Sequence, residues 1–396
     1  MSERISDVYV VDAVRTPFGK YAGALSGIRP DDLAARVVAA LLARTPQLDP
    51  TRIGDVVLGN ANGAGEENRN VARMAVLLAG LPVSVPGVTV NRLCGSGLEA
   101  VIQAVRAIRV GDADIVVAGG VESMSRAPWV LPKPERGFPA GHQELHSTTL
   151  GWRMVNRLMP AEWTVPLGES AELIAAKHLI SREEQDLFAL ASHEKASRAW
   201  RDGLLDAEIV PVDGVDLPRD ECVREGGTPE SMARLKPAFL PDGTVTAGNA
   251  SPLNDGAAAL LLVGEHALAE LGREPLARIR AGAVSAIEPQ WFGLGPVAAG
   301  RRALERAGLD FDDLLTVELN EAFAAQALGC LAELPELDPA KVNPRGGAIA
   351  VGHPLGASGA RLVGSVAHQL AAHGAGTGLA TLCIGVGQGL ALVLER

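Results

Sequence analysis

The 396-residue sequence predicts an α/β fold built from two similar halves about a pseudo-twofold axis. Helical and extended apolar segments alternate at both ends of the chain, as expected when helices cover sheets. The order of these segments in the first part is repeated near the C-terminus, which indicates a duplicated unit. Hydrophobic residues make up 47% of the chain, enough for a large buried core.

The first half opens with a short strand. Apolar runs predict strands at 8–11 and 56–58, with a helix at 33–42 between them. A second helix follows Cys94, because the apolar residues after it recur at helical spacing. The β-branched run at 115–118 then predicts a further buried strand.

The second half repeats this order. A helix is predicted at 297–307 and a strand at 316–319, followed by a glycine-rich turn. A helix from about 358 to 370 and a strand at 379–382 complete the match. Two helix–strand pairs in the same order therefore predict duplication.

The middle of the chain does not continue this alternation of helices and strands. Several prolines interrupt it, and a long helix is predicted from Ser181 to Trp200, opening with a capping box. Long insertions on a rigid scaffold commonly carry binding specificity, so we expect a lid over the site. The expected units are an N-terminal half (1–120 with 246–275), an inserted loop domain (121–245) and a C-terminal half (276–396).

Charge and cysteine content exclude several classes. The net charge of −11 gives a nucleic-acid partner little electrostatic support. Four cysteines without a CxxC pair do not form a disulfide framework. The N-terminus lacks a signal peptide's apolar core, and no apolar run approaches the length of a membrane span. The sequence thus predicts a reduced, cytoplasmic protein.

Cys94 lies between an extended segment and a helix. Helix N-termini carry partial positive charge, which favours a thiolate at this position. Gly95 and Gly97 would allow a ligand close to the sulfur. A buried core cysteine is the competing interpretation, since free cysteines are among the most buried residues.

Three further residues occupy comparable places. His353 lies in a glycine-dense turn, Asn320 follows a strand, and Cys383 precedes a glycine turn. Taken singly, each is better explained as a structural hydrogen-bond partner, a helix cap or core filler. Together with Cys94 they all fall at strand ends or helix mouths, where α/β proteins concentrate chemistry.

The motifs around these residues are NRLCGSG at Cys94, NEAF at Asn320, GHPLGASGAR at Gly352 and the glycine turn after Cys383. In this content and order the chain resembles the thiolase family, and the resemblance covers nearly its whole length. It implies a duplicated, five-layered α-β-α-β-α fold. It also implies an acyltransferase of the EC 2.3.1 class, which cleaves 3-oxoacyl-CoA with CoA or runs the reverse Claisen condensation.

The resemblance implies a role for each residue. Cys94 attacks the ketone carbonyl and carries the acyl group, while His353 accepts its proton. Cys383 returns a proton to the acetyl-CoA carbanion. One oxyanion is held by His353 and a water fixed by Asn320, the other by the backbone N–H groups of Cys94 and Gly385.

Coenzyme A is implied as a substrate, with no metal or redox cofactor. Arg224 is expected near its nucleotide, Ala247 and Ser251 along the pantetheine arm, and Phe323 against its apolar part. The partners implied are acyl-CoA and CoA, with no nucleic acid. Because members of the family are oligomeric, the resemblance also predicts a homodimer or homotetramer.

Some positions depart from the family pattern. Pro166 and Leu167 replace the His-Met of short-chain biosynthetic members, and Phe292 also shapes the acyl pocket. We therefore favour a broad or longer-chain 3-oxoacyl-CoA substrate, with acetoacetyl-CoA and the dicarboxylic 3-oxoadipyl-CoA as alternatives. Val386 replaces a glycine and would be strained at positive φ, while Pro252 stiffens the loop beside CoA.

Other interpretations of these residues have less support. A ketoacyl synthase would carry a second histidine at position 320, so Asn320 disfavours that enzyme class. An inactive CoA or lipid carrier would not need all four reactive residues, so their presence disfavours a carrier. A role in a β-oxidation complex is compatible with catalysis. His142 and His146 have a zinc-like spacing, but the prolines and glycines nearby indicate a loop. Cys222 and Cys330 receive no role.

Overall fold

Strands from both halves join in one ten-stranded sheet in the computed structural model, which describes residues 6–396. The strand order is β10-β11-β12-β9-β1-β8-β5-β3-β4, with β2 beside β8. The first half contributes β1 (Val8–Arg15), β2 (Gly19–Lys20), β3 (Asp55–Gly59), β4 (Val88–Val90), β5 (Ile115–Ser123) and β8 (Asn254–Gly264). The second contributes β9 (Ala277–Ala286), β10 (Leu314–Leu319), β11 (Thr377–Ile384) and β12 (Gln388–Glu395).

The pairing confirms the predicted duplication. β3 is parallel to β4 and β5, and β5 then pairs antiparallel with β8. In the second half β10 is parallel to β11, and β11 pairs antiparallel with β12. A parallel bridge from Val317 to Val342 stands where β4 pairs with β3. The halves meet where β1 pairs with β9.

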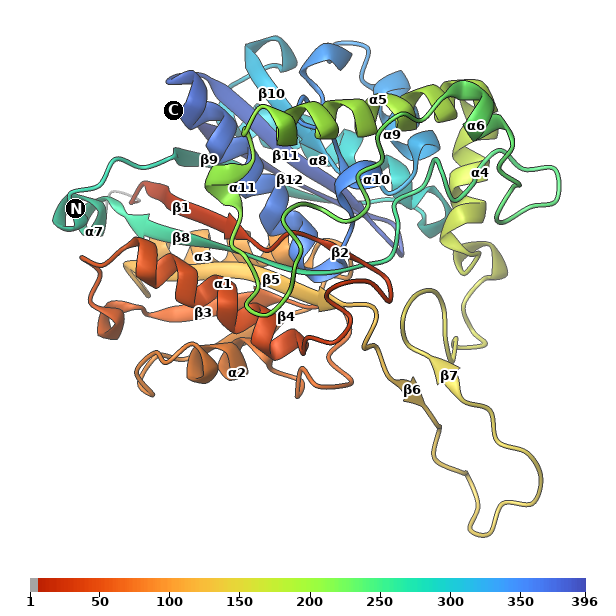
Figure 1. Ribbon diagram of the computed structural model, residues 1–396, viewed down its shortest axis with the longest axis horizontal. Coiled ribbons are helices and arrows are strands. Elements are labelled where there is room, and N and C mark those ends of the chain that lie inside the picture. The colour runs from red at the N-terminus through yellow and green to blue at the C-terminus, as the bar shows by residue number, and fades with distance from the viewer. Residues whose placement is uncertain (1–5) are drawn as a thin grey trace.

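Helices complete five layers. Figure 1 shows the first-half elements in red and orange on one side and the second-half elements in blue on the other. Between them lie α3 (Ser96–Val110) and α11 (Leu355–His373), which pack on both parts of the sheet. The outer layers are α1 (Pro30–Arg44) with α2 (Val71–Leu78), and α8 (Gly295–Ala307) with α9 (Ala324–Glu333).

The strands are buried on both faces because they lie between helical layers. In β8, Leu260 and Leu262 belong to the central core, while Leu261 faces the outer helices α1 and α2. In β12, Leu392 belongs to the central core and Val393 to the core beneath α8. Each such leucine contributes about 1.5–3 kcal/mol by burial, which fixes the register of both halves.

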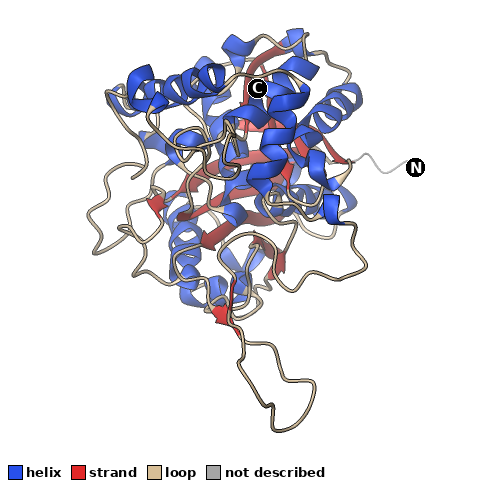
Figure 2. Ribbon diagram, turned by 90° about the vertical axis from the view of Figure 1, so that its right-hand side faces the viewer, coloured by secondary structure: helices blue, strands red, loops and turns tan. Residues whose placement is uncertain are grey.

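The inserted segment leaves the sheet after β5 and returns at β8. It begins with an arm formed by β6 (Trp129–Val130) and β7 (His146–Ser147), which projects from the body (Figure 2). The remaining helices are α4 (Leu167–Lys177), α5 (Arg182–Arg201), α6 (Pro229–Ala233), α7 (Glu265–Leu271) and α10 (Ala348–Val351). The capping box that opens α5 at Ser181 and Glu184 is present as predicted.

Metal sites and membrane-spanning helices can both be looked for within residues 6–396. His142 lies in a loop, and within this range no three His, Cys, Asp or Glu side chains form a group that could hold a metal ion. In the same range, no helix has both the length and the apolar character needed to cross a bilayer.

Candidate active site

Cys94 lies in a tight turn between β4 and α3. The turn is closed by hydrogen bonds from the N–H groups of Gly95 and Ser96 to the carbonyl oxygens of Arg92 and Leu93, both 3.0 Å. Leu93 has φ +49°, a left-handed conformation that costs a leucine about 1–3 kcal/mol. Gly97 brings α3 against α11, because a Cβ there would lie 2.5 Å from the carbonyl oxygen of Gly356. The turn thus places Cys94 just before α3, where the first turn of α3 packs against the first turn of α11.

The thiol of Cys94 is protonated in the free protein. Burial raises its pKa to about 11, although the backbone N–H groups of Gly385 and Cys94 itself act to lower it. Desolvation is the largest cause and the N–H groups offset it only in part, so burial opposes the thiolate that we expected at this helix N-terminus. A base is needed to ionise this sulfur.

His353 is held in one tautomer. The Ser358 hydroxyl donates to the Pro354 carbonyl oxygen at 2.8 Å, so its oxygen accepts from His353 Nδ1–H at 2.6 Å. This leaves the lone pair on Nε2, where the Asn320 amide N–H approaches it at 3.4 Å. Burial, followed by the charge of Arg361, lowers the pKa of His353 to about 3. The imidazole is therefore neutral, with Nε2 able to accept a proton.

The loop carrying His353 is anchored from a distant part of the chain. The His353 backbone N–H donates to Asn254 Oδ1 at 2.8 Å, and Asn254 Nδ2 donates to the Gly19 carbonyl oxygen at 2.8 Å. Gly352 has φ +113°, and a Cβ there would lie 2.7 Å from Asn254 Nδ2. Ser358 belongs to the GHPLGASGAR motif, but neither its contacts nor those of Asn254 could be derived from spacing.

Asn320 stands beside His353 at the end of β10. Its Nδ2 lies 3.4 Å from His353 Nε2. Its backbone N–H donates to the Thr381 carbonyl oxygen at 3.0 Å, which aligns it with β11. The side chain is fully buried, and Oδ1 accepts no hydrogen bond from the described residues. A buried acceptor of this kind requires a donor from a water or a ligand.

Cys383 is brought to the same place by β11. Burial raises the pKa of its thiol well above the usual value, and the sulfurs of Cys94 and Cys330 raise it further. Cys383 is thus a neutral thiol close to Cys94. It packs in a small apolar cluster with Phe292 and Phe323, against which Leu167 also rests.

Glu122 is a buried acid that the sequence analysis did not single out. Its carboxylate accepts hydrogen bonds from the backbone N–H groups of Ala61, Asn62 and Gly356 at 2.8–3.1 Å. Burial nonetheless raises its pKa to about 7, opposed by these N–H groups. Glu122, on β5, therefore joins the loop after β3 to the first turn of α11 beside Cys94.

A cavity of about 170 Å³ opens beside Cys94. Its wall includes Leu167 and Val386, and its charged lining residues are Glu122 and Arg153. Val386 has φ +67°, so this β-branched residue does adopt the strained left-handed conformation. The turn is left-handed here rather than extended.

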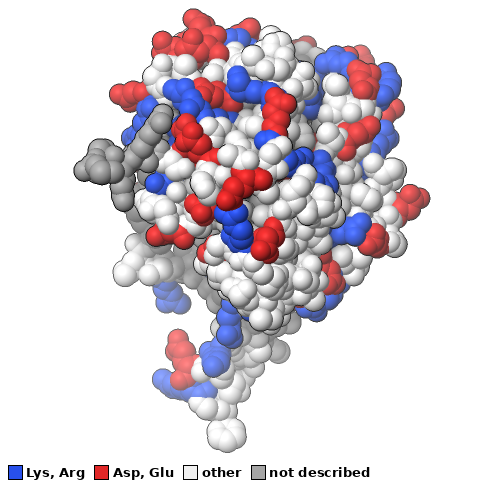
Figure 3. Space-filling view, turned by 90° about the vertical axis from the view of Figure 1, so that its left-hand side faces the viewer, with Lys and Arg blue, Asp and Glu red and all other residues white. Residues whose placement is uncertain are grey.

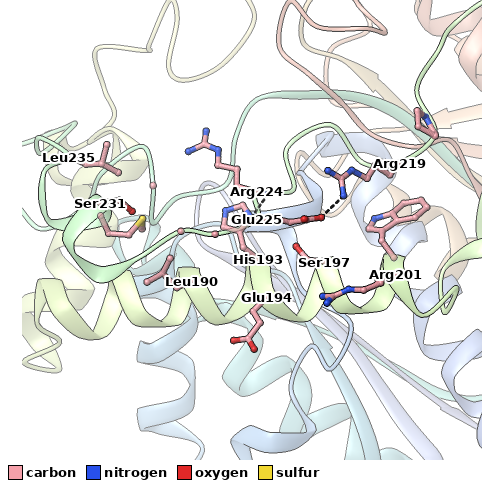
Figure 4. A pocket seen from close by; sticks show the side chains of 16 residues that line it. Leu190, His193, Glu194, Ser197, Arg201, Arg219, Arg224, Glu225, Ser231 and Leu235 are labelled. Carbon is pink, nitrogen blue, oxygen red and sulfur yellow. Dashed lines mark hydrogen bonds and ion pairs between the residues drawn. The ribbon is translucent and has the colours of Figure 1, made fainter.

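Arg224 lies elsewhere, in a cleft of about 1060 Å³ along α5. Figure 4 shows Arg224 with Arg219 and Arg201 around this cleft, above His193 of α5. The Arg224 backbone N–H donates to His193 Nδ1 at 3.2 Å. Burial, then the Arg224 charge, lowers the pKa of His193 to about 4, so the cleft holds a neutral imidazole.

The other residues expected to contact CoA are Ser251, Phe323 and Ala247. Ser251 donates to the Ala322 carbonyl oxygen through its backbone and its hydroxyl, both at 3.0 Å. The ring of Phe323 meets Phe239 edge-on at 6.0 Å. Ala247 is exposed, next to Gly248 of the Arg224 cleft. On the face in Figure 3, acidic and basic side chains are interspersed.

Comparisons with known proteins agree with this architecture. The model of the thiolase N-terminal domain matches residues 8–266, and that of the thiolase C-terminal domain matches 273–396. A beta-ketoadipyl-CoA thiolase of Escherichia coli is 54% identical, over 98% of this chain and 99% of that protein. A 3-oxoadipyl-CoA/3-oxo-5,6-dehydrosuberyl-CoA thiolase of E. coli strain K12 is 53% identical with the same coverage.

Solved structures give the same result. The crystal structure of the Bacillus anthracis acetyl-CoA acetyltransferase superposes with a TM-score of 0.93, at 39% identity and full coverage of both chains. Human mitochondrial 3-ketoacyl-CoA thiolase, in complex with CoA, superposes with a TM-score of 0.92 at 38% identity, covering 99% of this chain and 98% of that one.

Proposed function

The chain belongs to the thiolase family and is a 3-oxoacyl-CoA acyltransferase, and on that premise we propose that its substrate is 3-oxoadipyl-CoA. The reaction would consume 3-oxoadipyl-CoA and CoA and release succinyl-CoA and acetyl-CoA. Full-length identity above 50% to two thiolases named for this substrate carries the proposal.

In the first step, Cys94 attacks the ketone carbon. The proton of its thiol passes to His353 Nε2, which carries the lone pair because Nδ1–H is bound to Ser358. The new bond joins sulfur to the ketone carbon, and the carbon–carbon bond then breaks to leave an acyl thioester on Cys94. Because thiol and imidazole are both neutral at rest, ionisation is coupled to substrate binding.

The second thiol completes the cleavage. Cys383 donates its proton to the acetyl-CoA carbanion, and its raised pKa keeps it protonated until then. The N–H groups of Cys94 and Gly385, which face the Cys94 sulfur, stabilise one developing oxyanion. His353, once protonated at Nε2, and a water fixed by the Asn320 amide stabilise the other. Donors of this kind are each worth about 2.7–4 kcal/mol of barrier.

Cavity size also supports a short acyl group. At about 170 Å³, the space beside Cys94 is smaller than the roughly 300–1,000 Å³ of sites for drug-sized ligands. A succinyl group suits it better than a long alkyl chain. The longer-chain preference that we favoured from Pro166 and Leu167 is therefore set aside in favour of the dicarboxylic alternative.

Coenzyme A would span the two cavities. We assign its nucleotide phosphates to Arg224 and the neighbouring arginines of the α5 cleft, where guanidinium groups suit phosphate oxygens. Ala247 and Ser251 would follow the pantetheine arm toward Phe323. The CoA complex of the human relative supports this use of the fold.

Two broader features complete the proposal. The four cysteines are all free, and the chemistry needs two of them reduced, which suits a cytoplasmic setting. Large apolar side chains on the arm, among them Trp129 and Phe138, are exposed in the single chain. We infer that they meet a second copy in a homodimer or homotetramer, which light scattering would measure.

Thiolysis rates across a matched series test the substrate. 3-Oxohexanoyl-CoA has the same chain length as 3-oxoadipyl-CoA but ends in a methyl group. We expect kcat/KM for 3-oxoadipyl-CoA to exceed that for 3-oxohexanoyl-CoA at least about tenfold, a difference of about 1.4 kcal/mol. Equal values, or a preference for acetoacetyl-CoA, would reject the dicarboxylic substrate while leaving the thiolase reaction intact.

A further inference from the structure

Arg153 is a cation in the cavity that holds Cys94. It is half-buried, and the ion pairs of residues 6–396 do not include it. Arg126, from the start of the same insertion, is by contrast paired with Glu66 at 2.5 Å. A guanidinium that lines a substrate cavity without an acidic partner is suited to an anionic group of the substrate.

The wall that carries Arg153 is fixed to the body. Trp152 donates its indole N–H to the Val165 carbonyl oxygen at 3.1 Å. Asn62 Nδ2 donates to Thr148 Oγ1 at 2.9 Å, and the Thr148 hydroxyl donates to the Pro128 carbonyl oxygen at 2.6 Å. These bonds hold residues 148–153 to Asn62 of the body at one end and to Val165 of the insertion at the other, so Arg153 lies in a segment that is bonded at both ends.

Glu122 is the other charged residue of the cavity. Its oxygens are already occupied by three backbone N–H groups, so it has little capacity left to pair with Arg153. A methyl-ended acyl group would offer no acceptor to a guanidinium that loses water on binding. A terminal carboxylate supplies that acceptor in a bidentate geometry.

We propose that Arg153 binds the terminal carboxylate of the dicarboxylic acyl group while its other end reacts at Cys94. The inference rests on the proposed function and adds the residue that binds the carboxylate at the end of the acyl group away from Cys94. A short dicarboxylic chain places both ends within the one cavity lined by Cys94 and Arg153. Arg153 is thus a specificity-determining residue for the thiolase reaction.

The test compares Arg153→Met with Arg157→Gln, an exposed arginine of the same loop outside the cavity lining. Both are assayed with 3-oxoadipyl-CoA and 3-oxohexanoyl-CoA. Loss of a charge-assisted hydrogen bond should lower kcat/KM of Arg153→Met for 3-oxoadipyl-CoA roughly 10- to 100-fold. Its kcat/KM for 3-oxohexanoyl-CoA should be unchanged or higher, and Arg157→Gln should match the wild type on both.

The outcomes separate the two proposals. A wild type that prefers 3-oxoadipyl-CoA, with the same preference in Arg153→Met, overturns the role of Arg153 alone. An equal loss on both substrates assigns Arg153 to CoA binding or to folding and also overturns it. A wild type without the preference rejects the substrate itself. Arg153→Lys, which keeps the charge, should recover part of the preference even if Arg153→Met folds poorly.

Discussion

Replacing Ser358 by alanine should disable His353 without touching either sulfur. The hydroxyl is fully buried, accepts from His353 Nδ1–H at 2.6 Å and donates to the Pro354 carbonyl oxygen at 2.8 Å. In the alanine variant the Nδ1–H is left buried without an acceptor, which costs about 1–3 kcal/mol. The Nδ1–H tautomer then loses its advantage, so we expect acylation of Cys94 to slow roughly 10- to 100-fold.

Single-turnover acylation, followed by mass spectrometry after rapid quenching, measures this step directly. Urea unfolding should show a parallel loss of about 1–3 kcal/mol in the free energy of unfolding. Ser365→Ala is the matched control, because Ser365 is a buried serine two turns further along α11. A normal acylation rate in Ser358→Ala, despite reduced stability, would refute the reasoning that the hydroxyl sets the tautomer.

Three further predictions concern strain, pH and CoA. Val386→Gly should raise the free energy of unfolding by up to about 1 kcal/mol, since relief of the left-handed strain exceeds the entropy cost of glycine; urea melts showing a loss would mean that the valine packs favourably. His353 has a folded pKa of about 3, below that of the unfolded chain, so its contribution to stability is complete above about pH 6.5 and declines as pH falls toward 3. Over that window the free energy of unfolding of the wild type should fall by up to about 1.4 kcal/mol per pH unit, and His353→Gln should lack this fall. Parallel pH profiles of unfolding for the two proteins would contradict the buried neutral imidazole. Arg224→Gln should raise KM for CoA about tenfold but leave the rate with pantetheine as the acceptor thiol unchanged, while the exposed Arg198→Gln on α5 should change neither.

The fold was predictable because its signals are local. Helical spacing after Cys94 and alternation of apolar runs indicated α3 and β5, and the repeated order indicated the duplicated halves. Strand ends were less accurate: the run at 8–11 predicted only the first part of β1, which continues to Arg15. The later residues of β1 include buried polar side chains, and a hydropathy pattern does not predict a strand over such residues.

Sequence motifs supplied the proposed residues of the site but not their protonation. Motifs identified Cys94 and His353, whereas the neutral resting state of both depends on burial by distant segments. The Asn254 anchor joins residues 99 positions apart, a contact that spacing cannot reveal. Arg153 carried no motif at all, and only the cavity indicates its importance.

Mass spectrometry of the protein after incubation with succinyl-CoA tests the central claim most directly. We predict that peptide mapping will locate the succinyl group on Cys94, and that Cys94→Ala will acquire none while remaining folded. Cys383→Ala should still be acylated on Cys94 but should lose thiolysis of 3-oxoadipyl-CoA. An acyl group found on Cys383, or normal thiolysis by Cys383→Ala, would contradict the division of labour between the two thiols.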